Sequence, residues 1–143
     1  MDVKDKSKGF DVFLSYSHPD QDWATSLAQA LSRQGVSVWT DSMIKLGDSL
    51  IDSIETAMEQ SKYIVLLVSP NSTRSSWAAF ELGAALGMGK SVVPVVSAQV
   101  STDDLAGPIR SRKFLREDDP ETIASQIASV VLHQDESYMS NGA

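Results

Sequence analysis

Residues 63–68 read Tyr-Ile-Val-Leu-Leu-Val, a run that is apolar at every position. Successive side chains of a strand point to opposite faces, so both faces of this run are apolar and need cover. Strands of this kind are typical of parallel sheets that have helices packed on each side. We therefore predict a buried parallel strand at 63–68 at the centre of an α/β domain.

Strand and helix patterns alternate outward from this run. Short apolar segments predict further strands at 10–15, 36–40, 91–97 and 113–115. Helical spacing places the inward positions of the helix after residue 48 at Leu50, Ile51, Ile54, Ala57 and Met58. The same spacing places those of the last helix at Ile123, Ile127, Val130 and Val131. A strand–helix unit repeated about five times predicts an α/β domain with a mostly parallel sheet.

Five such units favour a flavodoxin-like three-layer sandwich, a five-stranded mostly parallel sheet in the order 2-1-3-4-5 with helices on both faces. In that topology the ligand crevice lies at the carboxyl ends of strands 1 and 3, where the strand order reverses. This rule indicates the loops 15–20 and 69–76, with 41–47 beside them. We predict one domain over residues 9–132, with flexible tails at 1–8 and 133–143.

Composition excludes several classes of function. The chain has 143 residues, 12 Lys+Arg against 19 Asp+Glu, and a net charge of −7, which disfavours nucleic acid as a partner. There is no cysteine, and His18 and His133 lie far apart, so we expect no metal site and no cofactor. The polar N-terminus and the lack of an apolar run of about 20 residues indicate a cytoplasmic protein that does not enter a membrane.

Two motifs invite enzymatic interpretations that their positions disfavour. Residues 84–91 satisfy the loose P-loop pattern, but they end a predicted helix and lead into a strand, so the helix dipole has the wrong sign for phosphate. Ser17, His18 and Asp20 resemble a hydrolytic triad, but three residues of one turn seldom reach triad geometry. We expect Ser17 and Asp20 to cap the following helix instead.

Glu81 is the only charged residue between Trp77 and Gly89. Trp77 and Glu81 are four residues apart and share one face of the predicted helix at 75–88, which leaves the sheet beside the crevice. A carboxylate among apolar neighbours is costly unless it is paired, protonated or used. One alternative is an amphipathic helix in which Glu81 occupies a narrow polar stripe. The other is a site that uses the carboxylate.

A lone carboxylate beside an indole suits one kind of reaction. The carboxylate can bind ribose hydroxyls and stabilise a cationic sugar as a glycosidic bond breaks, and the indole face attracts positive charge. Most glycosidases need a second carboxyl group to protonate the leaving oxygen. A pyridinium base leaves as a neutral molecule and needs no acid. One glutamate therefore fits nicotinamide release better than ordinary sugar hydrolysis.

Several segments together resemble the Toll/interleukin-receptor (TIR) domains, especially those of prokaryotes. These segments are Phe-Asp-Val-Phe-Leu-Ser-Tyr-Ser at 10–17, Val-Trp-Thr-Asp at 38–41, Leu-Gly-Asp at 46–48 and Ser-Trp-Ala-Ala-Phe-Glu-Leu at 76–82. Their order and spacing make the resemblance specific, and it extends over residues 9 to 132. It implies the flavodoxin-like fold and one of two functions.

In the first function, the resemblance implies an enzyme that cleaves NAD⁺ into nicotinamide and ADP-ribose, or a cyclic isomer used in immune signalling. Glu81 is then the catalytic residue. The residues implied to bind substrate are Ser15, Tyr16, Ser17, Trp39, Asp41, Lys45, Leu46, Gly47 and Trp77. Self-association with other TIR domains is implied for activity. The pyrophosphate of NAD⁺ requires local positive potential, expected from Lys45, Arg74 and the helix N-terminus after Ser69.

In the second function, the chain is a non-catalytic adaptor that assembles with other TIR domains, often through the loop at 41–48. The presence of Glu81 favours the enzyme, since an adaptor has no need of it. A phosphorelay receiver on the same fold would need an acidic pair after strand 1 and Asp at the end of strand 3, where this chain has Ser15, Tyr16 and Ser69. Plainer roles also stay open, with Trp39 in the core and Asp41 starting a turn.

Overall fold

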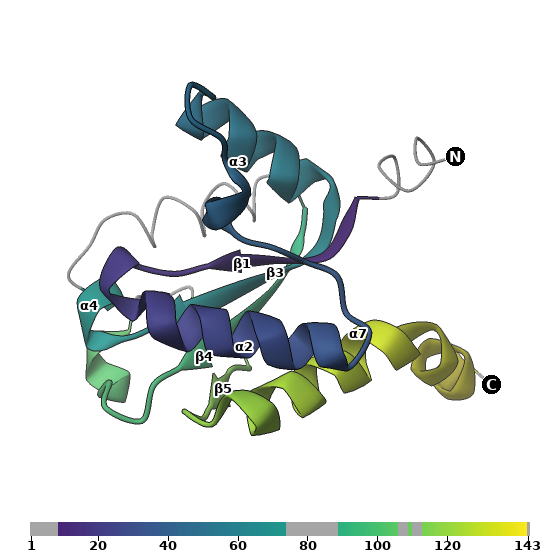
Figure 1. Cartoon of the computed structure of the whole chain (residues 1–143). Coiled ribbons are helices and arrows are strands. Elements are labelled where there is room, and N and C mark those ends of the chain that lie inside the picture. The colour runs from purple at the N-terminus through teal and green to yellow at the C-terminus, as the bar shows by residue number, and fades with distance from the viewer. Residues whose placement is uncertain (1–8, 74–88, 106–108, 110–112, 143) are drawn as a thin grey trace.

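The computed structural model describes residues 9–73, 89–105, 109 and 113–142 (Figure 1). In the helix α4 (Pro70–Thr73) the side chains are described up to Ser72, and in the last helix, α7 (Pro120–Gly142), up to Leu132. The predicted helix at 75–88 lies outside the described residues. Within these ranges no helix is both long and apolar enough to span a bilayer.

The centre of the structure is a parallel sheet of five strands in the order β2-β1-β3-β4-β5. Its strands are β1 (Phe10–Ser15), β2 (Val38–Trp39), β3 (Ser61–Val68), β4 (Ser91–Val96) and β5 (Leu115–Arg116). The predicted fold class and strand order are therefore confirmed. The strand order reverses between β1 and β3, which pair from Phe10 with Ser61 to Ser15 with Leu66.

Strand β3 is buried on both faces, as its sequence predicts. Val65 and Leu67 belong to one core cluster with residues of β1 and the helices on that face. Ile64 packs on the other face with residues of α3 (Leu50–Glu59). Leu66 and Val68 join a third cluster with Val96, Val100, Leu105 and Ile109. The alternation shows why the run at 63–68 has no polar residue, because neither face meets water.

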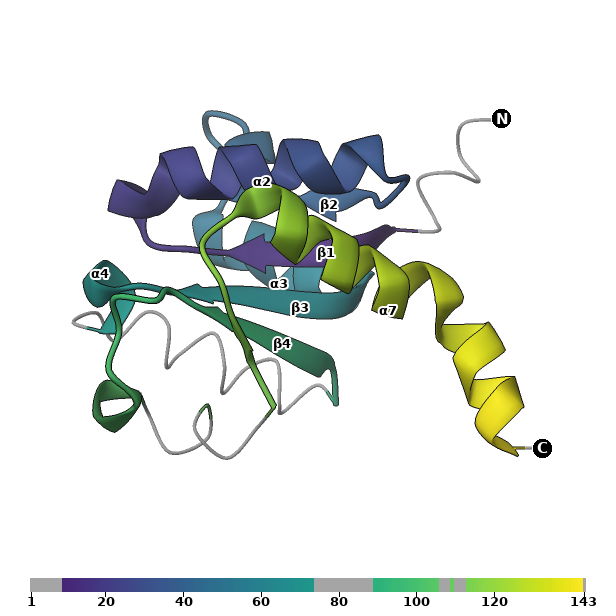
Figure 2. The same ribbon diagram turned by 90° about the horizontal axis from the view of Figure 1, so that it is seen from below.

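Helices cover the two faces of the sheet. Helices α2 (Gln21–Arg33) and α7 (Pro120–Gly142) pack against each other on one face, and α3 lies on the opposite face (Figures 1 and 2). The shorter elements are η1 (His18–Asp20), η2 (Asp41–Met43), α4 (Pro70–Thr73) and η3 (Thr102–Asp104). Ser49 caps α3 by accepting a hydrogen bond from the Asp52 amide.

Four strands differ in extent from their predictions, and β3 and β4 do so least: β3 begins at Ser61 instead of 63, and β4 ends at Val96 instead of 97. Strand β2 is confined to 38–39 because the Val36 amide donates back to Leu31 at the end of α2, and the Thr40 carbonyl accepts from Met43 in η2. Strand β5 lies at 115–116 instead of 113–115. The strand order is unaffected, because β2 still pairs with β1 and β5 with β4, both in parallel.

The predicted inward faces of two helices are only partly correct. Ile54, Ala57 and Met58 are buried, but Leu50 and Ile51 are 54% and 56% exposed, because the first turn of α3 projects away from the sheet (Figure 1). In α7, Val130 is half exposed while Ile123 and Ile127 are buried. Helix α7 continues to Gly142, beyond residue 132 where the sequence predicts the end of the domain.

A matched pair of substitutions tests the double-sided burial of β3. Leu67 is fully buried and Leu46 is fully exposed, so Leu67→Ala and Leu46→Ala remove the same atoms from opposite environments. We expect Leu67→Ala to lower the free energy of unfolding by about 2 to 5 kcal/mol, because it leaves a cavity. Leu46→Ala should change it by less than about 0.5 kcal/mol. Equal effects in urea denaturation would contradict this assignment of the core.

Candidate functional site at the carboxyl edge of the sheet

Three described loops leave the sheet at its carboxyl edge, around the point where the strand order reverses. One follows β1 at Ser15, one follows β2 at Trp39, and one follows β3 at Val68. The strands are parallel, so their carboxyl ends lie at the same edge, as the sequence predicts. Side-chain hydrogen bonds join the first loop to each of the other two.

The first link joins Tyr16 to Asp41. The Tyr16 hydroxyl donates to Asp41 Oδ1 at 2.5 Å, which ties the loop after β1 to the first residue of η2. Burial of the Tyr16 ring raises the pKa of its phenol above the ordinary value, and the hydrogen bond and negative charge of Asp41 raise it further. The phenol is therefore a hydrogen-bond donor throughout the neutral pH range.

The second link joins Asp20 to the loop after β3. Ser69 Oγ donates to Asp20 Oδ2 at 2.5 Å, and Asn71 Nδ2 donates to Asp20 Oδ1 at 2.9 Å. The expectation that Ser17 and Asp20 are helix caps is wrong, because neither side chain makes a capping hydrogen bond. The Asp20 carboxylate instead spans the reversal point between β1 and β3.

Ser69 occupies the start of α4 and satisfies its backbone. Its hydroxyl oxygen accepts from the amides of Asn71 at 3.1 Å and Ser72 at 3.2 Å, and its own amide donates to Ser72 Oγ. The sequence suggested that amides after Ser69 would face a pyrophosphate. The amides of residues 71 and 72 already have a partner in Ser69, so they do not supply that anion site.

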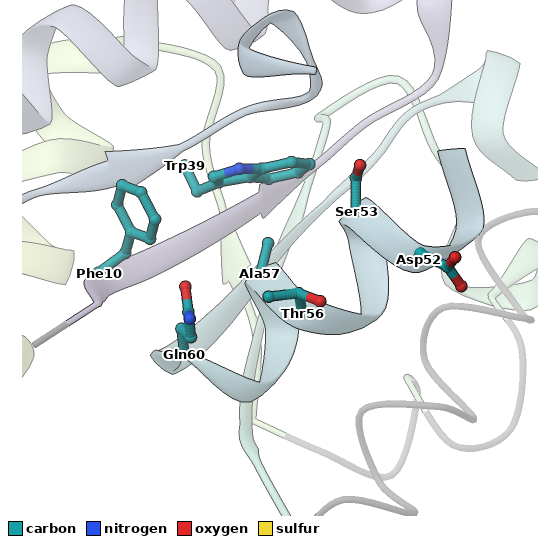
Figure 3. A pocket seen from close by; sticks show the side chains of 7 residues that line it. All are labelled: Phe10, Trp39, Asp52, Ser53, Thr56, Ala57 and Gln60. Atoms are coloured by element: carbon teal, nitrogen blue, oxygen red, sulfur yellow. The ribbon is translucent and has the colours of Figure 1, made fainter. Parts of the chain in front are cut away.

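Trp39 lies in the core cluster that α3 covers, whereas Tyr16 packs against the cluster on the other face of the sheet. The Trp39 ring stacks on Phe13 with centroids 4.8 Å apart and planes 10° from parallel. Trp39 also helps to line an open pocket of about 260 Å³ beside α3. Figure 3 shows Trp39 and Phe10 on one side of this pocket, opposite Ala57 and Thr56 of α3 and Gln60, which follows the helix. Asp52 and Ser53 complete the lining.

The loop at 41–48 is a tight, exposed turn. The Lys45 amide donates to Asp48 Oδ2 at 3.1 Å, and the Asp48 amide donates back to the Lys45 carbonyl at 3.0 Å. Gly47 has φ of +92°, a conformation that favours glycine, and nothing lies within 4 Å of the position a Cβ would take. Leu46 is fully exposed at the tip of this turn. The turn therefore presents an apolar side chain and a lysine to solvent.

The sequence-predicted residues thus fall into four groups, and Trp39 in the core is a group by itself. Tyr16 and Asp41 are joined directly, with Ser15 buried at the end of β1 and Ser17 next along the same loop. Lys45, Leu46 and Gly47 form the neighbouring turn. Arg74, Trp77 and Glu81 lie outside the described residues. The chain runs toward them from Thr73, the last described residue after β3.

Sequence reasoning missed the role of Asp20, Ser69 and Asn71 as one hydrogen-bonded unit. Asp20 and Ser69 each follow one of the two strands at the predicted reversal point, so their proximity could have been found from the topology. The partner choice could not, because a helix cap is the commoner use of an aspartate before a helix. Among the described residues, no three histidines or carboxylates form a group that could hold a metal ion.

Comparison with known proteins defines the family. The family model for the TIR domain matches residues 12–128, so this chain belongs to the TIR domain family. It is 32% identical over 83 residues, 57% of its length, to the 2′ cyclic ADP-D-ribose synthase BtTIR of Bacteroides thetaiotaomicron. It is 28% identical over 135 residues, 87% of its length, to the 2′ cyclic ADP-D-ribose synthase AbTIR of Acinetobacter baumannii.

These relatives are longer proteins. The matched regions cover 29% of BtTIR and 50% of AbTIR, so this chain spans half or less of each. Among solved structures, the metazoan TIR-STING receptor from C. gigas superposes with a TM-score of 0.75 and 24% identity, over 85% of this chain and 39% of that one. That similarity confirms the fold.

The Tyr16–Asp41 link predicts a specific pH dependence of stability. The folded state holds the phenol proton more tightly than the unfolded state, whose tyrosine pKa is about 10. The stabilisation is complete below that pH and is lost as pH rises from it toward the raised pKa. We expect the free energy of unfolding of the wild type to fall above pH 10 more steeply than that of Tyr16→Phe. Parallel pH curves for the two proteins in urea denaturation would contradict the link.

Proposed function

We propose that this domain cleaves NAD⁺, releasing nicotinamide and forming ADP-ribose or a cyclic isomer. The observation that carries the proposal is the joined carboxyl edge, where the Tyr16–Asp41 and Asp20–Ser69 bonds hold three loops together. This edge is the position at which a doubly wound sheet binds its ligand, and the chain continues from it toward Glu81. The names of BtTIR and AbTIR, which are cyclic ADP-ribose synthases, support the same reaction.

The proposed chemistry needs little from the protein beyond placement and charge. The bond between ribose C1′ and the nicotinamide nitrogen breaks with its electron pair passing to the nitrogen, so the pyridinium leaves as a neutral molecule. Positive charge then develops on the ribose, and the Glu81 carboxylate stabilises it. Water, losing a proton, completes hydrolysis, whereas a nucleophile within the remaining ADP-ribose completes cyclisation. Trp77 stacks against the leaving nicotinamide ring.

The described loops would bind the rest of the substrate. Tyr16 and Asp41 present a phenol and a carboxylate as one unit, suited to ribose hydroxyls, with Ser15 and Ser17 on the same loop. Lys45 and Gly47 border the entrance through the turn at 41–48, and Lys45 supplies positive charge for the pyrophosphate. Trp39 would contribute indirectly, because its ring stacks on Phe13 of β1, the strand that leads into the loop containing Tyr16.

Self-association is part of the proposal. Four large apolar side chains that follow one another along residues 43–51, in the loop at 41–48 and the first turn of α3, are exposed. We call this set the exposed row; its members are Met43, Leu46, Leu50 and Ile51. Large apolar side chains gathered on a surface indicate contact with another protein. We propose that other TIR domains cover this row and that activity rises with assembly, in an immune or defence signalling role.

The alternative is a non-catalytic adaptor, and the same exposed row favours it. A scaffold needs the apolar contact and has no use for an ionised Glu81. The two functions predict different outcomes for one assay, because only the enzyme consumes NAD⁺.

Substitution of Glu81 separates the two functions. We expect concentrated wild-type protein to release nicotinamide from NAD⁺, and Glu81→Gln to lower kcat about 100-fold or more, because the developing cation loses its stabilising charge. Glu55→Gln is the matched control, since Glu55 is an exposed glutamate of α3. Equal activity of Glu81→Gln and wild type would remove Glu81 from the mechanism. Absence of activity in clustered wild-type protein would favour the adaptor.

Substitution of Leu46 tests assembly. We expect nicotinamide release per molecule to rise with protein concentration in the wild type, and Leu46→Glu to abolish that rise together with the larger species seen by light scattering. The reason is that the change places a charge in an apolar contact. Gln99→Glu, on an exposed loop after β4, is the control for added negative charge. Activity strictly proportional to wild-type concentration across the range in which species grow would contradict the role of assembly.

A further inference from the structure

The proposed reaction gives the Asp20–Ser69–Asn71 network no part in binding or converting the substrate. Asp20 is partly buried after β1, and its two carboxylate oxygens each accept a hydrogen bond from a different residue of the loop after β3. That loop leads from the central strand to the segment of sequence that contains Trp77 and Glu81. The network therefore joins the loop containing Tyr16 to the origin of that segment.

Every hydrogen-bonding capacity of the Ser69 hydroxyl is used. A serine hydroxyl has one proton to donate and two lone pairs to accept with. The two lone pairs face the amides of Asn71 and Ser72. The remaining capacity is the hydroxyl proton, which Ser69 Oγ donates to Asp20 Oδ2 at an oxygen–oxygen distance of 2.5 Å. Ser69 is itself buried, so the arrangement is shielded from competing water.

The Asp20 carboxylate accepts from both groups that face it. These groups, Ser69 Oγ and Asn71 Nδ2, are donors. An asparagine at position 20 can accept from Ser69 with its amide oxygen and donate to Asn71 with its amide nitrogen, once the Asn71 amide turns over and presents its oxygen. An alanine at this position can make neither hydrogen bond.

We infer that Asp20 is a positioning residue for the proposed reaction: it sets the direction in which the chain leaves β3 and so places the residues that follow. The inference rests on the proposed function. Asp20 acts through Ser69 and Asn71, not on the substrate. A misplacement of about 1 Å in an active site can lower a rate about 100-fold, so a lost anchor at this reversal point has a measurable consequence.

Two substitutions at position 20 give the sharpest test. In Asp20→Asn, the amide oxygen of residue 20 can accept from Ser69 while its nitrogen donates to the oxygen of a turned Asn71 amide, so both hydrogen bonds remain with one reversed. In Asp20→Ala, both hydrogen bonds are lost. Asp22→Ala is the matched control, since Asp22 is exposed two residues along on α2.

We expect Asp20→Ala to lower kcat for nicotinamide release about 10- to 100-fold, with a much smaller change in KM. Asp20→Asn should retain about tenfold more activity than Asp20→Ala. Asp22→Ala should match the wild type. An Asp20→Asn protein that is as inactive as Asp20→Ala while its hydrogen bonds remain would overturn the inference, because the Asp20 carboxylate would then act directly on the substrate. Full activity in Asp20→Ala would overturn it as well.

A second readout does not depend on catalysis. The Ser72 amide donates to Ser69 Oγ, so its hydrogen exchange reports on the network. We expect exchange at Ser72 to quicken about tenfold in Asp20→Ala and to stay near the wild-type rate in Asp20→Asn. If wild-type protein does not cleave NAD⁺, the proposed function fails and the positioning role falls with it. Exchange then still decides whether Asp20 anchors the loop, and unchanged exchange in Asp20→Ala would overturn that anchor.

Discussion

Burial of β3 on both faces is the constraint on which the rest of this structure depends. The apolar run at 63–68 requires a helical layer on each side, and a parallel sheet with helices on both sides requires crossover connections. The chain meets this requirement with α2 and α7 on one face and α3 on the other (Figures 1 and 2). The same crossovers bring the loops after β1, β2 and β3 to one edge of the sheet.

That edge is organised by charge and hydrogen bonding in a protein that is acidic overall. Two carboxylates, Asp41 and Asp20, each accept from a neighbouring loop instead of remaining free. Their partners are neutral donors, Tyr16, Ser69 and Asn71. Although the chain has a net charge of −7, these two carboxylates both have hydrogen-bond partners. In the proposed function, this ordered edge faces the negatively charged pyrophosphate of NAD⁺.

The sequence predicts the fold well because its signals are local and repeated. The run at 63–68 and the alternation of strands and helices lead to the fold class and the strand order, both of which the structure confirms. The limits of β2 and the exposure of Leu50 and Ile51 could not be predicted from periodicity. They depend on where α2 ends and on how far α3 extends beyond the sheet.

The candidate site is predicted less completely. The topology indicates the correct loops, but it does not show that Tyr16 binds Asp41 or that Asp20 binds Ser69. Those partners depend on side-chain directions that a sequence does not contain. Trp39, which the TIR resemblance places near the substrate, lies against Phe13 beside α3 (Figure 3). Trp39 belongs to the core cluster that α3 covers, whereas Tyr16 packs against the cluster on the other face of the sheet.

The proposed binding of NAD⁺ at the carboxyl edge of the sheet is tested most directly by amide chemical shifts. NAD⁺ would be titrated into ¹⁵N-labelled Glu81→Gln protein, in which turnover is suppressed. We expect changes in amide chemical shift concentrated at residues 15–20, 41–48 and 69–73. No change is expected at Gly9, Gly35 and Lys90, which lie at the opposite edge of the sheet. Shifts centred on the opposite edge, or no saturable shifts at millimolar NAD⁺, would contradict it.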